Sequence, residues 1–139
     1  MSYLPDGIPG PEPTFDDTPF WDFCEKEELR FQRCGDCGRH RMPPSPFCPH
    51  CQSQAVEWVP APEAAELFSF TVVHHPAHPE IKAALPYNVA IVIFPDCDDV
   101  RLISNVVDAA PEEMAIGMPL RLTWETAGNG RKVPRFRKA

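Results

Sequence analysis

The sequence predicts a mainly β protein, in which a short N-terminal helix and a metal-stapled segment precede a small barrel. Two observations carry this prediction. Four of the six cysteines form two Cys-x-x-Cys pairs within residues 34–51, and five segments with strand-like composition follow from Leu67 onward. Five strands in about 70 residues is the count of a five-stranded barrel such as the oligonucleotide/oligosaccharide-binding (OB) fold, whereas a β-sandwich needs about seven.

Residues 1–17 hold four prolines and two glycines and lack apolar periodicity. We expect them to form a flexible N-terminal arm, with an extended arm that lies on a partner as the alternative. Thr18 and Pro19 then suit a helix start. The Thr18 hydroxyl can accept a hydrogen bond from a free N–H group of the first turn, and the N–H that proline lacks would have no partner at the first helical position. The predicted helix ends near Glu28.

Three aromatic residues crowd the start of this helix: Phe20, Trp21 and Phe23. Clustered aromatic side chains are usually core residues. They are also the composition of a contact patch for another subunit. Both interpretations stay open at this point.

The metal-stapled segment is flanked by two predicted strands. Residues 29–33 alternate apolar with polar side chains and lead into Cys34, and residues 55–59 return as a partner strand. The Pro-Ala-Pro sequence at 60–62 ends this pattern. We therefore expect a helix and ribbon domain over residues 18–62 and a barrel domain with a basic tail over residues 63–139.

The barrel strands are expected where β-branched and aromatic residues concentrate between turn signals. The turns are the acidic segment 95–99 and the Gly-Asn-Gly sequence at 128–130. The five expected strands are Leu67–His75, Asn88–Phe94, Val100–Val107, Leu120–Thr126 and Val133–Arg137.

The cysteine spacing predicts a structural zinc site. Each Cys-x-x-Cys pair can form a knuckle, in which the backbone folds so that both thiolates point at one ion. Two knuckles supply the four thiolates that tetrahedral zinc prefers. A complete sulfur shell leaves no open coordination position for a catalytic water. Gly38 suits the left-handed backbone that often follows a knuckle, whereas Gln52 occupies the equivalent place at a cost of about 1 kcal/mol. Redox chemistry would need one exposed pair on a βαβ scaffold, which the sequence lacks. The expected ligands are Cys34, Cys37, Cys48 and Cys51.

The charge of the chain argues against general nucleic-acid binding. The formal net charge is −7, although the last nine residues carry five bases and no acid. No apolar run approaches the roughly 18 residues that cross a bilayer, and the N-terminus has no basic, apolar leader. We therefore expect a cytoplasmic protein without a membrane segment, in a reducing compartment where paired cysteines favour metal.

Several of these features, taken in order, resemble the family called domain of unknown function 35. They are Phe20-Trp21, the strand into Cys34, the two knuckles and four later segments: Phe70–His74, Pro86–Ala90, Ile116–Pro119 and Pro134–Phe136. The resemblance implies an N-terminal helix, a rubredoxin-like zinc ribbon and an OB-fold barrel. It also implies a hetero-oligomer with a thiolase-superfamily subunit that acts on acyl-CoA, including aldolases of steroid side-chain degradation.

On this basis we expect an accessory subunit that stabilises its partner or helps to bind acyl-CoA, with no catalysis by the chain alone. The basic residues Arg131, Lys132 and Arg135 are candidates for the CoA phosphates, or else form a solvated tail. A nucleic-acid-binding module is the alternative, since zinc ribbons and OB folds both serve that role. An independent enzyme that uses His74, His75 or His78 is a third hypothesis.

Overall fold

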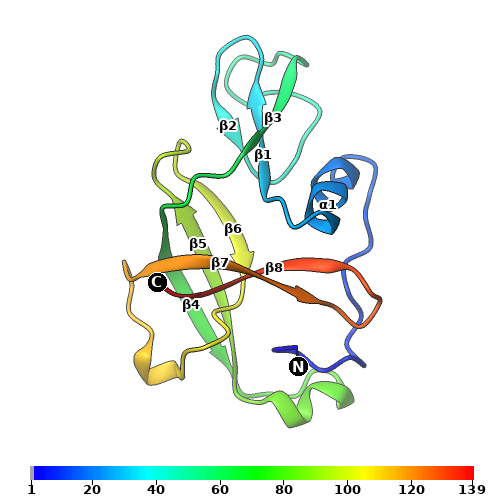
Figure 1. Ribbon diagram of the computed structural model, residues 1–139, viewed down its shortest axis with the longest axis vertical. Coiled ribbons are helices and arrows are strands. Elements are labelled where there is room, and N and C mark those ends of the chain that lie inside the picture. Colours follow the sequence, from blue (N-terminus) through cyan, green and yellow to red (C-terminus); the bar gives the residue numbers. More distant parts are fainter. Residues whose placement is uncertain (1) are drawn as a thin grey trace.

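The computed structural model describes residues 2–139, and Met1 lies outside the described residues. A small lobe of three strands stands above a larger five-stranded unit, and a short helix lies beside their junction (Figure 1). Among the described residues, no helix is long and apolar enough to cross a bilayer. In chain order the elements are α1 (Thr18–Glu25), β1 (Arg30–Cys34), β2 (His40–Arg41), β3 (Val56–Pro60), β4 (Ala65–Val73), the 3-10 helix η1 (Pro79–Ala84), β5 (Tyr87–Phe94), β6 (Val100–Ser104), the 3-10 helix η2 (Pro111–Glu113), β7 (Pro119–Thr126) and β8 (Lys132–Lys138).

Helix α1 is shorter than expected and starts one residue earlier. Asp17 holds the N-cap position, and Thr18 is the first helical residue rather than the cap. The helix ends at Glu25 because Glu27 adopts a left-handed backbone with φ 56°. Phe20 and Cys24, one helical turn apart, are the buried residues of α1.

The small lobe is an antiparallel sheet in the order β2-β1-β3. Strand β1 pairs with β3 along its whole length, from Arg30 opposite Pro60 to Cys34 opposite Val56, which confirms the predicted strand pair. Strand β2 was not predicted, because two residues carry no readable periodicity.

The larger sheet has the order β6-β5-β4-β7-β8, with antiparallel neighbours. It closes into a barrel where β8 meets the segment after β6. There the N–H of Phe136 donates to the carbonyl of Asn105 (3.0 Å), and the N–H of Val107 donates to the carbonyl of Phe136 (2.8 Å). The mainly β fold class, with a zinc ribbon region and an OB-like barrel, is thus confirmed.

One hydrophobic core joins the two units. Phe31 of β1 is fully buried, and its ring meets Phe94 of β5 edge-to-face at 5.0 Å between centroids. Phe94 in turn meets Phe136 of β8 at 6.1 Å. The division at residue 62 stays a prediction, but the packing of the ribbon strand against barrel residues makes a single core across it.

The N-terminal arm lies along the barrel without a helix or strand of its own until α1 begins. It passes between η1 and the β7–β8 turn and then rises to α1 (Figure 1). Ser2 donates its hydroxyl to the carbonyl of Thr126 (2.8 Å), and the Asn129 side chain donates to the carbonyl of Pro11 (3.0 Å). The expected flexibility stays a prediction, but these contacts with the barrel had no signal in the sequence.

Candidate metal centre

The two Cys-x-x-Cys pairs fold as matched knuckles. In the first, the N–H of Gly38 donates to the carbonyl of Cys34 (3.0 Å), and in the second, the N–H of Gln52 donates to the carbonyl of Cys48 (2.8 Å). Gly38 has φ 76° and Gln52 has φ 65°. Both positions are therefore left-handed, as expected, and the second knuckle holds a non-glycine residue in that conformation.

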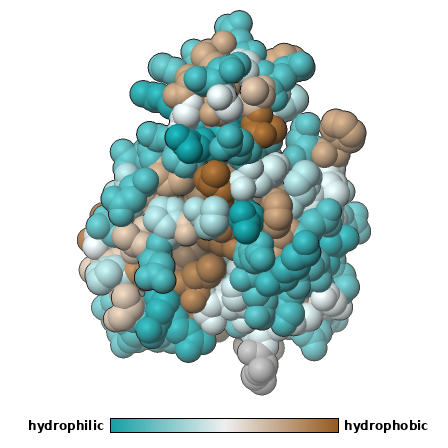
Figure 2. All heavy atoms as spheres, turned by 45° about the horizontal axis from the view of Figure 1, so that its top comes forward, coloured by the Kyte–Doolittle hydropathy of each residue, from teal (hydrophilic) through white to brown (hydrophobic). Residues whose placement is uncertain are grey.

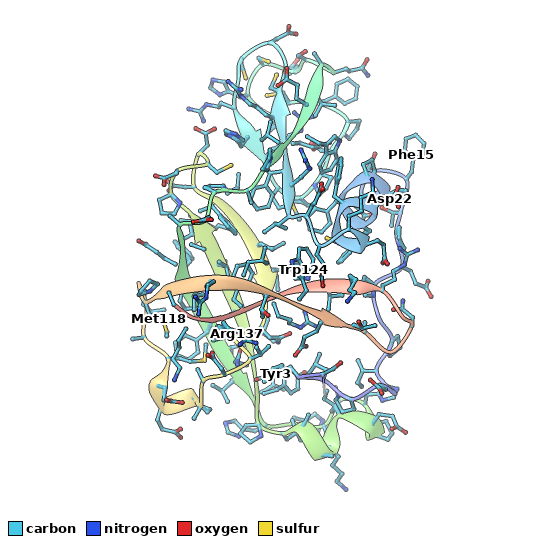
Figure 3. All side chains as sticks on the ribbon, viewed as in Figure 1. Tyr3, Phe15, Asp22, Met118, Trp124 and Arg137 are labelled. Carbon is cyan, nitrogen blue, oxygen red and sulfur yellow. The ribbon has the colours of Figure 1, made fainter. Side chains whose placement is uncertain are left out.

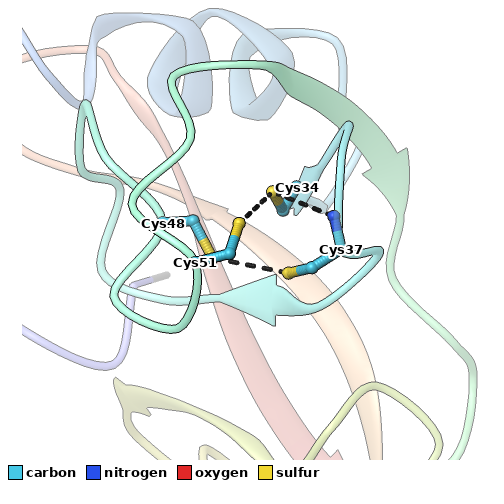
Figure 4. Close-up of side chains that lie close together, drawn as sticks. All are labelled: Cys34, Cys37, Cys48 and Cys51. Carbon is cyan, nitrogen blue, oxygen red and sulfur yellow. Dashed lines mark hydrogen bonds between the residues drawn. The ribbon is translucent and has the colours of Figure 1, made fainter.

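The four sulfur atoms converge on one point (Figure 4). The Sγ atoms of Cys34 and Cys51 lie 3.5 Å apart, those of Cys37 and Cys48 lie 3.6 Å apart, and all four lie within 4.8 Å of one another. A tetrahedron with Zn–S bonds near 2.3 Å places sulfur atoms about 3.8 Å apart. The donor set and its spacing therefore fit a structural zinc ion. Within residues 2–139, this is also the one group of three or more His, Cys, Asp or Glu side chains close enough to hold a metal.

Backbone N–H groups favour thiolates at the first cysteine of each knuckle. The N–H groups of Cys37 and Asp36 lower the pKa of Cys34 to about 6. The N–H of Cys51, with that of His50, lowers the pKa of Cys48 below its usual value. Since zinc binds the thiolate and not the thiol, the backbone favours the zinc-binding form at these two ligands. Burial and the neighbouring thiols raise the pKa of Cys37 and of Cys51, the latter to about 12, so these two ligands lose their protons when the ion binds. By contrast, burial raises the pKa of the isolated Cys24 and Cys97 thiols to about 12 and about 11, so these stay neutral.

Polar groups beside the knuckles fix the loop between them. The buried Gln32 accepts hydrogen bonds from the N–H of Ser45 (2.8 Å) and from Nε of Arg41 (3.0 Å). Arg41, also buried, donates to the carbonyl of Ser45 (2.9 Å). These residues orient the segment that leads to Cys48. They were not predicted, because a buried Gln-Arg pair has no signature in local sequence.

The zinc ribbon is tied to the barrel by His40. Its backbone N–H donates to the Asp98 carboxylate (2.9 Å), and its Nδ1 lies 2.7 Å from the same oxygen. Asp98 belongs to the β5–β6 turn, within the acidic segment 95–99 that the sequence predicts as a turn. The His40 backbone hydrogen bond, and then its side chain, hold the pKa of Asp98 below its usual range. The 58-residue separation of the two residues explains why the sequence did not reveal the contact.

We expect the Asp98→Asn protein to lose about 0.5 kcal/mol of stability at pH 7, because both side chains are partly exposed. A carboxylate with a lowered pKa in the folded state stabilises the fold above its unfolded pKa, near 4. This stability is lost as the pH falls through the lower folded value, so the difference from wild type should shrink as the pH falls below about 4. Urea unfolding at pH 7 and at a series of lower pH values, with the zinc content checked at each, measures it. Asp99→Asn is the matched control, since Asp99 has the same left-handed backbone. An equal loss from Asp99→Asn would contradict the assignment to the His40 contact.

The three aromatic residues of α1 have different environments. Phe20 is 2 % exposed and lies in the hydrophobic core of this chain. Phe23 packs against Trp58 at 5.9 Å and lies beneath the guanidinium of Arg30 at 5.0 Å. Trp21 is partly buried and lines a cavity of about 440 Å³. Of the three, Trp21 is therefore the side chain best placed to contact another molecule.

The cavity beside Trp21 occupies the seam between α1, the ribbon and the barrel. Its ribbon wall is the segment 42–44, and its barrel walls come from 101–103 in β6 and 133–135 in β8. Figure 2 shows hydrophobic residues gathered where the small lobe meets the body of the molecule. A second cavity, of about 460 Å³, lies where the linker at 61–63 meets β7 and β8.

The basic residues predicted to meet CoA phosphates already have acidic partners. Arg131 lies 3.7 Å from Glu25, and Lys132 lies 3.4 Å from Glu27. Arg135 lies 3.4 Å from Glu125 at a largely buried position. The three cations thus link β8 and the residue before it to β7, to the end of α1 and to the turn that follows α1. The exposed histidines 74, 75 and 78 join no metal cluster within the described chain, and His78 instead caps η1 by accepting the N–H of Glu80 (3.1 Å).

Comparison of the sequence and the fold with known proteins identifies relatives of this chain. Residues 21–57 match the family model described as "ChsH2, rubredoxin-like zinc ribbon domain", and residues 58–125 match "ChsH2, C-terminal OB-fold domain". Among solved structures, the chain superposes on one from "Ltp2-ChsH2(DUF35) aldolase" with a TM-score of 0.83 and 36 % identity, over 93 % of this chain and 98 % of that one.

Two curated relatives are longer. The "Probable enoyl-CoA hydratase alpha subunit" of Thermomonospora curvata is 39 % identical over 124 residues, which is 88 % of this chain and 38 % of the relative. The "3-oxo-4,17-pregnadiene-20-carboxyl-CoA hydratase alpha subunit" of Mycobacterium tuberculosis is 34 % identical over 120 residues, which is 86 % of this chain and 37 % of the relative. The chain therefore spans less than two fifths of the length of either.

Proposed function

Because the chain belongs to the DUF35 family, with the zinc ribbon and OB fold of ChsH2, we propose that it is the accessory subunit of a heteromeric acyl-CoA-processing enzyme. The observation that carries this proposal is its similarity, over nearly the full length of both chains, to the DUF35 chain of a solved aldolase. Its partner would be a thiolase-fold subunit that performs the carbon–carbon chemistry. Steroid side chains are the substrate class that the name of the mycobacterial relative supports.

In this proposal zinc has a structural role. The four cysteine ligands would complete a sulfur shell, so the ion supplies folding energy and no open coordination position. The ribbon then serves as a rigid arm beside α1 and the barrel. Of the predicted contact residues, Trp21 is the one we assign to the partner, because Phe20 is buried and Phe23 is packed between ribbon side chains.

Two other arginines are better candidates for the CoA phosphates than the ion-paired set. Arg121 of β7 and Arg137 of β8 are directly opposite in the strand register, and both are exposed. No acid within residues 2–139 forms an ion pair with either. Like charges in opposite positions destabilise a sheet, and a bound phosphate would relieve that repulsion. Arg121 also borders the second cavity, which offers apolar walls nearby.

The test is reconstitution with a thiolase-fold subunit identified by affinity purification and mass spectrometry from the host of this chain. We expect the two purified proteins to form a complex on size-exclusion chromatography. Only together should they cleave a carbon–carbon bond in the acyl chain of a β-hydroxyacyl-CoA by a retro-aldol reaction, which leaves a shorter acyl-CoA and a carbonyl compound. Full activity of the partner alone, without complex formation, would contradict the proposal. Trp21→Ala should weaken the complex, whereas Phe23→Ala, on the same helix, should not.

The same complex tests the phosphate assignment. Replacement of Arg121 and Arg137 with Gln should weaken CoA binding about tenfold at low salt and flatten its salt dependence. Replacement of Arg131 and Lys132 with Gln is the matched control, because it removes the same charge from ion-paired positions. Equal losses in both double variants would contradict the assignment, and calorimetric titration with CoA measures both.

A further inference from the structure

Asn88, at the start of β5, is the residue that completes the barrel where β6 has ended. It is 2 % exposed. Its side-chain amide donates to the carbonyl of Val106 (2.8 Å), and its side-chain oxygen accepts the N–H of Val106 (2.8 Å). The side chain of Asn105 donates to the backbone carbonyl of Asn88. One backbone N–H and one further amide N–H of Asn88 remain, and the barrel itself provides no acceptor for them.

Both remaining donors point at the phenol oxygen of Tyr3. The backbone N–H of Asn88 lies 2.9 Å from that oxygen, and the side-chain nitrogen lies 2.8 Å from it. Tyr3 comes from the N-terminal arm, 85 residues away in the sequence. Since a buried donor without an acceptor is costly, the Asn88 pair forms a receptor for one oxygen atom, and the arm supplies that oxygen.

The rest of the arm is held by the β7–β8 hairpin. The N–H of Tyr3 donates to both oxygens of Glu125 at 3.1 Å. A Cβ added to Gly128 would lie 1.9 Å from the carbonyl oxygen of Asp6, and one added to Gly7 would lie 2.7 Å from the Glu80 carboxylate. The arm therefore fits closely between the β7–β8 turn and η1. Figure 3 shows Tyr3 below the β7–β8 hairpin and above η1.

This position is the edge that OB folds use to bind ligands. In that fold, the loop between the first and second strands and the loop between the fourth and fifth strands frame the binding site. Here these loops are the segment that contains η1, between β4 and β5, and the turn between β7 and β8. The arm occupies the space between them as a ligand would.

We propose that Tyr3 is an internal ligand of the barrel, and that the Asn88 donors form a site for a flat ring with a terminal oxygen acceptor, which opens when the arm is displaced. The arm can leave because it has no helix or strand, and because most of its hydrogen bonds to the barrel are made at an exposed or half-buried surface. The barrel closure at Val106 and Phe136 does not involve the arm, so the receptor persists without it.

The test uses p-cresol, which is the tyrosine side chain as a free molecule. In the full chain with Tyr3→Ala, p-cresol should bind, raise the melting temperature and shift the NMR signals of both Asn88 N–H groups. Toluene, which lacks the oxygen, should bind about tenfold more weakly. Wild-type protein should show neither effect at the same concentrations, because Tyr3 fills the site.

A second variant keeps the ring. Tyr3→Phe removes only the oxygen, and we expect faster hydrogen exchange at the Asn88 backbone amide, with unchanged zinc content. The proposal is overturned if p-cresol leaves the Asn88 signals of the Tyr3→Ala protein unshifted, if toluene binds as well as p-cresol, or if Tyr3→Phe leaves exchange at Asn88 unchanged. None of these outcomes depends on a partner subunit, so the inference stands or fails apart from the proposed function.

Discussion

The Cys37→Ser protein is expected to lose its zinc and to unfold residues 29–59, while the barrel strands persist with reduced stability. Structural zinc contributes roughly 10–16 kcal/mol of apparent binding energy in small peptides, more than any other contact in the ribbon provides. Strand β2 has two residues, and the loop from Cys48 to Ser53 has no helix or strand. Neither β2 nor this loop has enough buried apolar surface to hold its shape once the metal is gone.

Zinc content by mass spectrometry and hydrogen exchange across the chain measure this result. We expect about one zinc per chain in the wild-type protein and a fraction of that in the variant, with exchange protection lost through β1, β2 and β3. His50→Ala is the matched control, because His50 lies inside the second knuckle and is exposed. A Cys37→Ser protein that retained a full zinc ion and its exchange protection would refute the four-thiolate site.

The second large effect is expected at Phe94. Its ring is 1 % exposed and lies between Phe31 of the ribbon and Phe136 of β8. Phe94→Ala should cost about 3–5 kcal/mol, because it removes a large buried side chain and leaves a cavity that close-packed neighbours fill poorly. That cost is a large share of the 5–15 kcal/mol that stabilises a typical domain.

Because Phe94 contacts both units, its loss should shift two transitions together. Urea unfolding monitored by tryptophan fluorescence reports on the fold, and zinc release to a chelating dye reports on the ribbon. Both midpoints are expected to fall in the Phe94→Ala protein. Phe68→Ala is the matched control, since Phe68 is 38 % exposed beneath Arg101 and should cost about 1 kcal/mol or less. A lowered unfolding midpoint with an unchanged midpoint for zinc release would show that the core is not shared.

Much of the fold was readable from sequence because its signals are local. Each predicted barrel strand has a counterpart in the structure, since alternation, β-branched residues and turn residues act over a few positions. The prediction that Gly38 and Gln52 would be left-handed is confirmed for the same reason, because a knuckle fixes the backbone just after its second cysteine. The meeting of the four sulfur atoms also follows from spacing alone.

The features that sequence reasoning missed depend on contacts between distant residues. The His40–Asp98 contact joins the ribbon to a barrel turn, and the Tyr3–Asn88 contact joins the arm to β5. Neither pair has a local pattern, and each residue alone has an ordinary explanation as a turn or loop residue. The ion pairs of Arg131, Lys132 and Arg135 also had no signal in the sequence, because their partners Glu25, Glu27 and Glu125 come from other parts of the chain.

The stack of Phe31, Phe94 and Phe136 has a consequence for how this chain can be divided. A cut at the proline-rich linker looks safe from composition, yet it would separate the buried ring of Phe31 from Phe94 and from the core that both share. Each fragment would then present a hydrophobic face to water, and such faces promote aggregation. The helix, ribbon and barrel are therefore expected to express and fold well only as one piece.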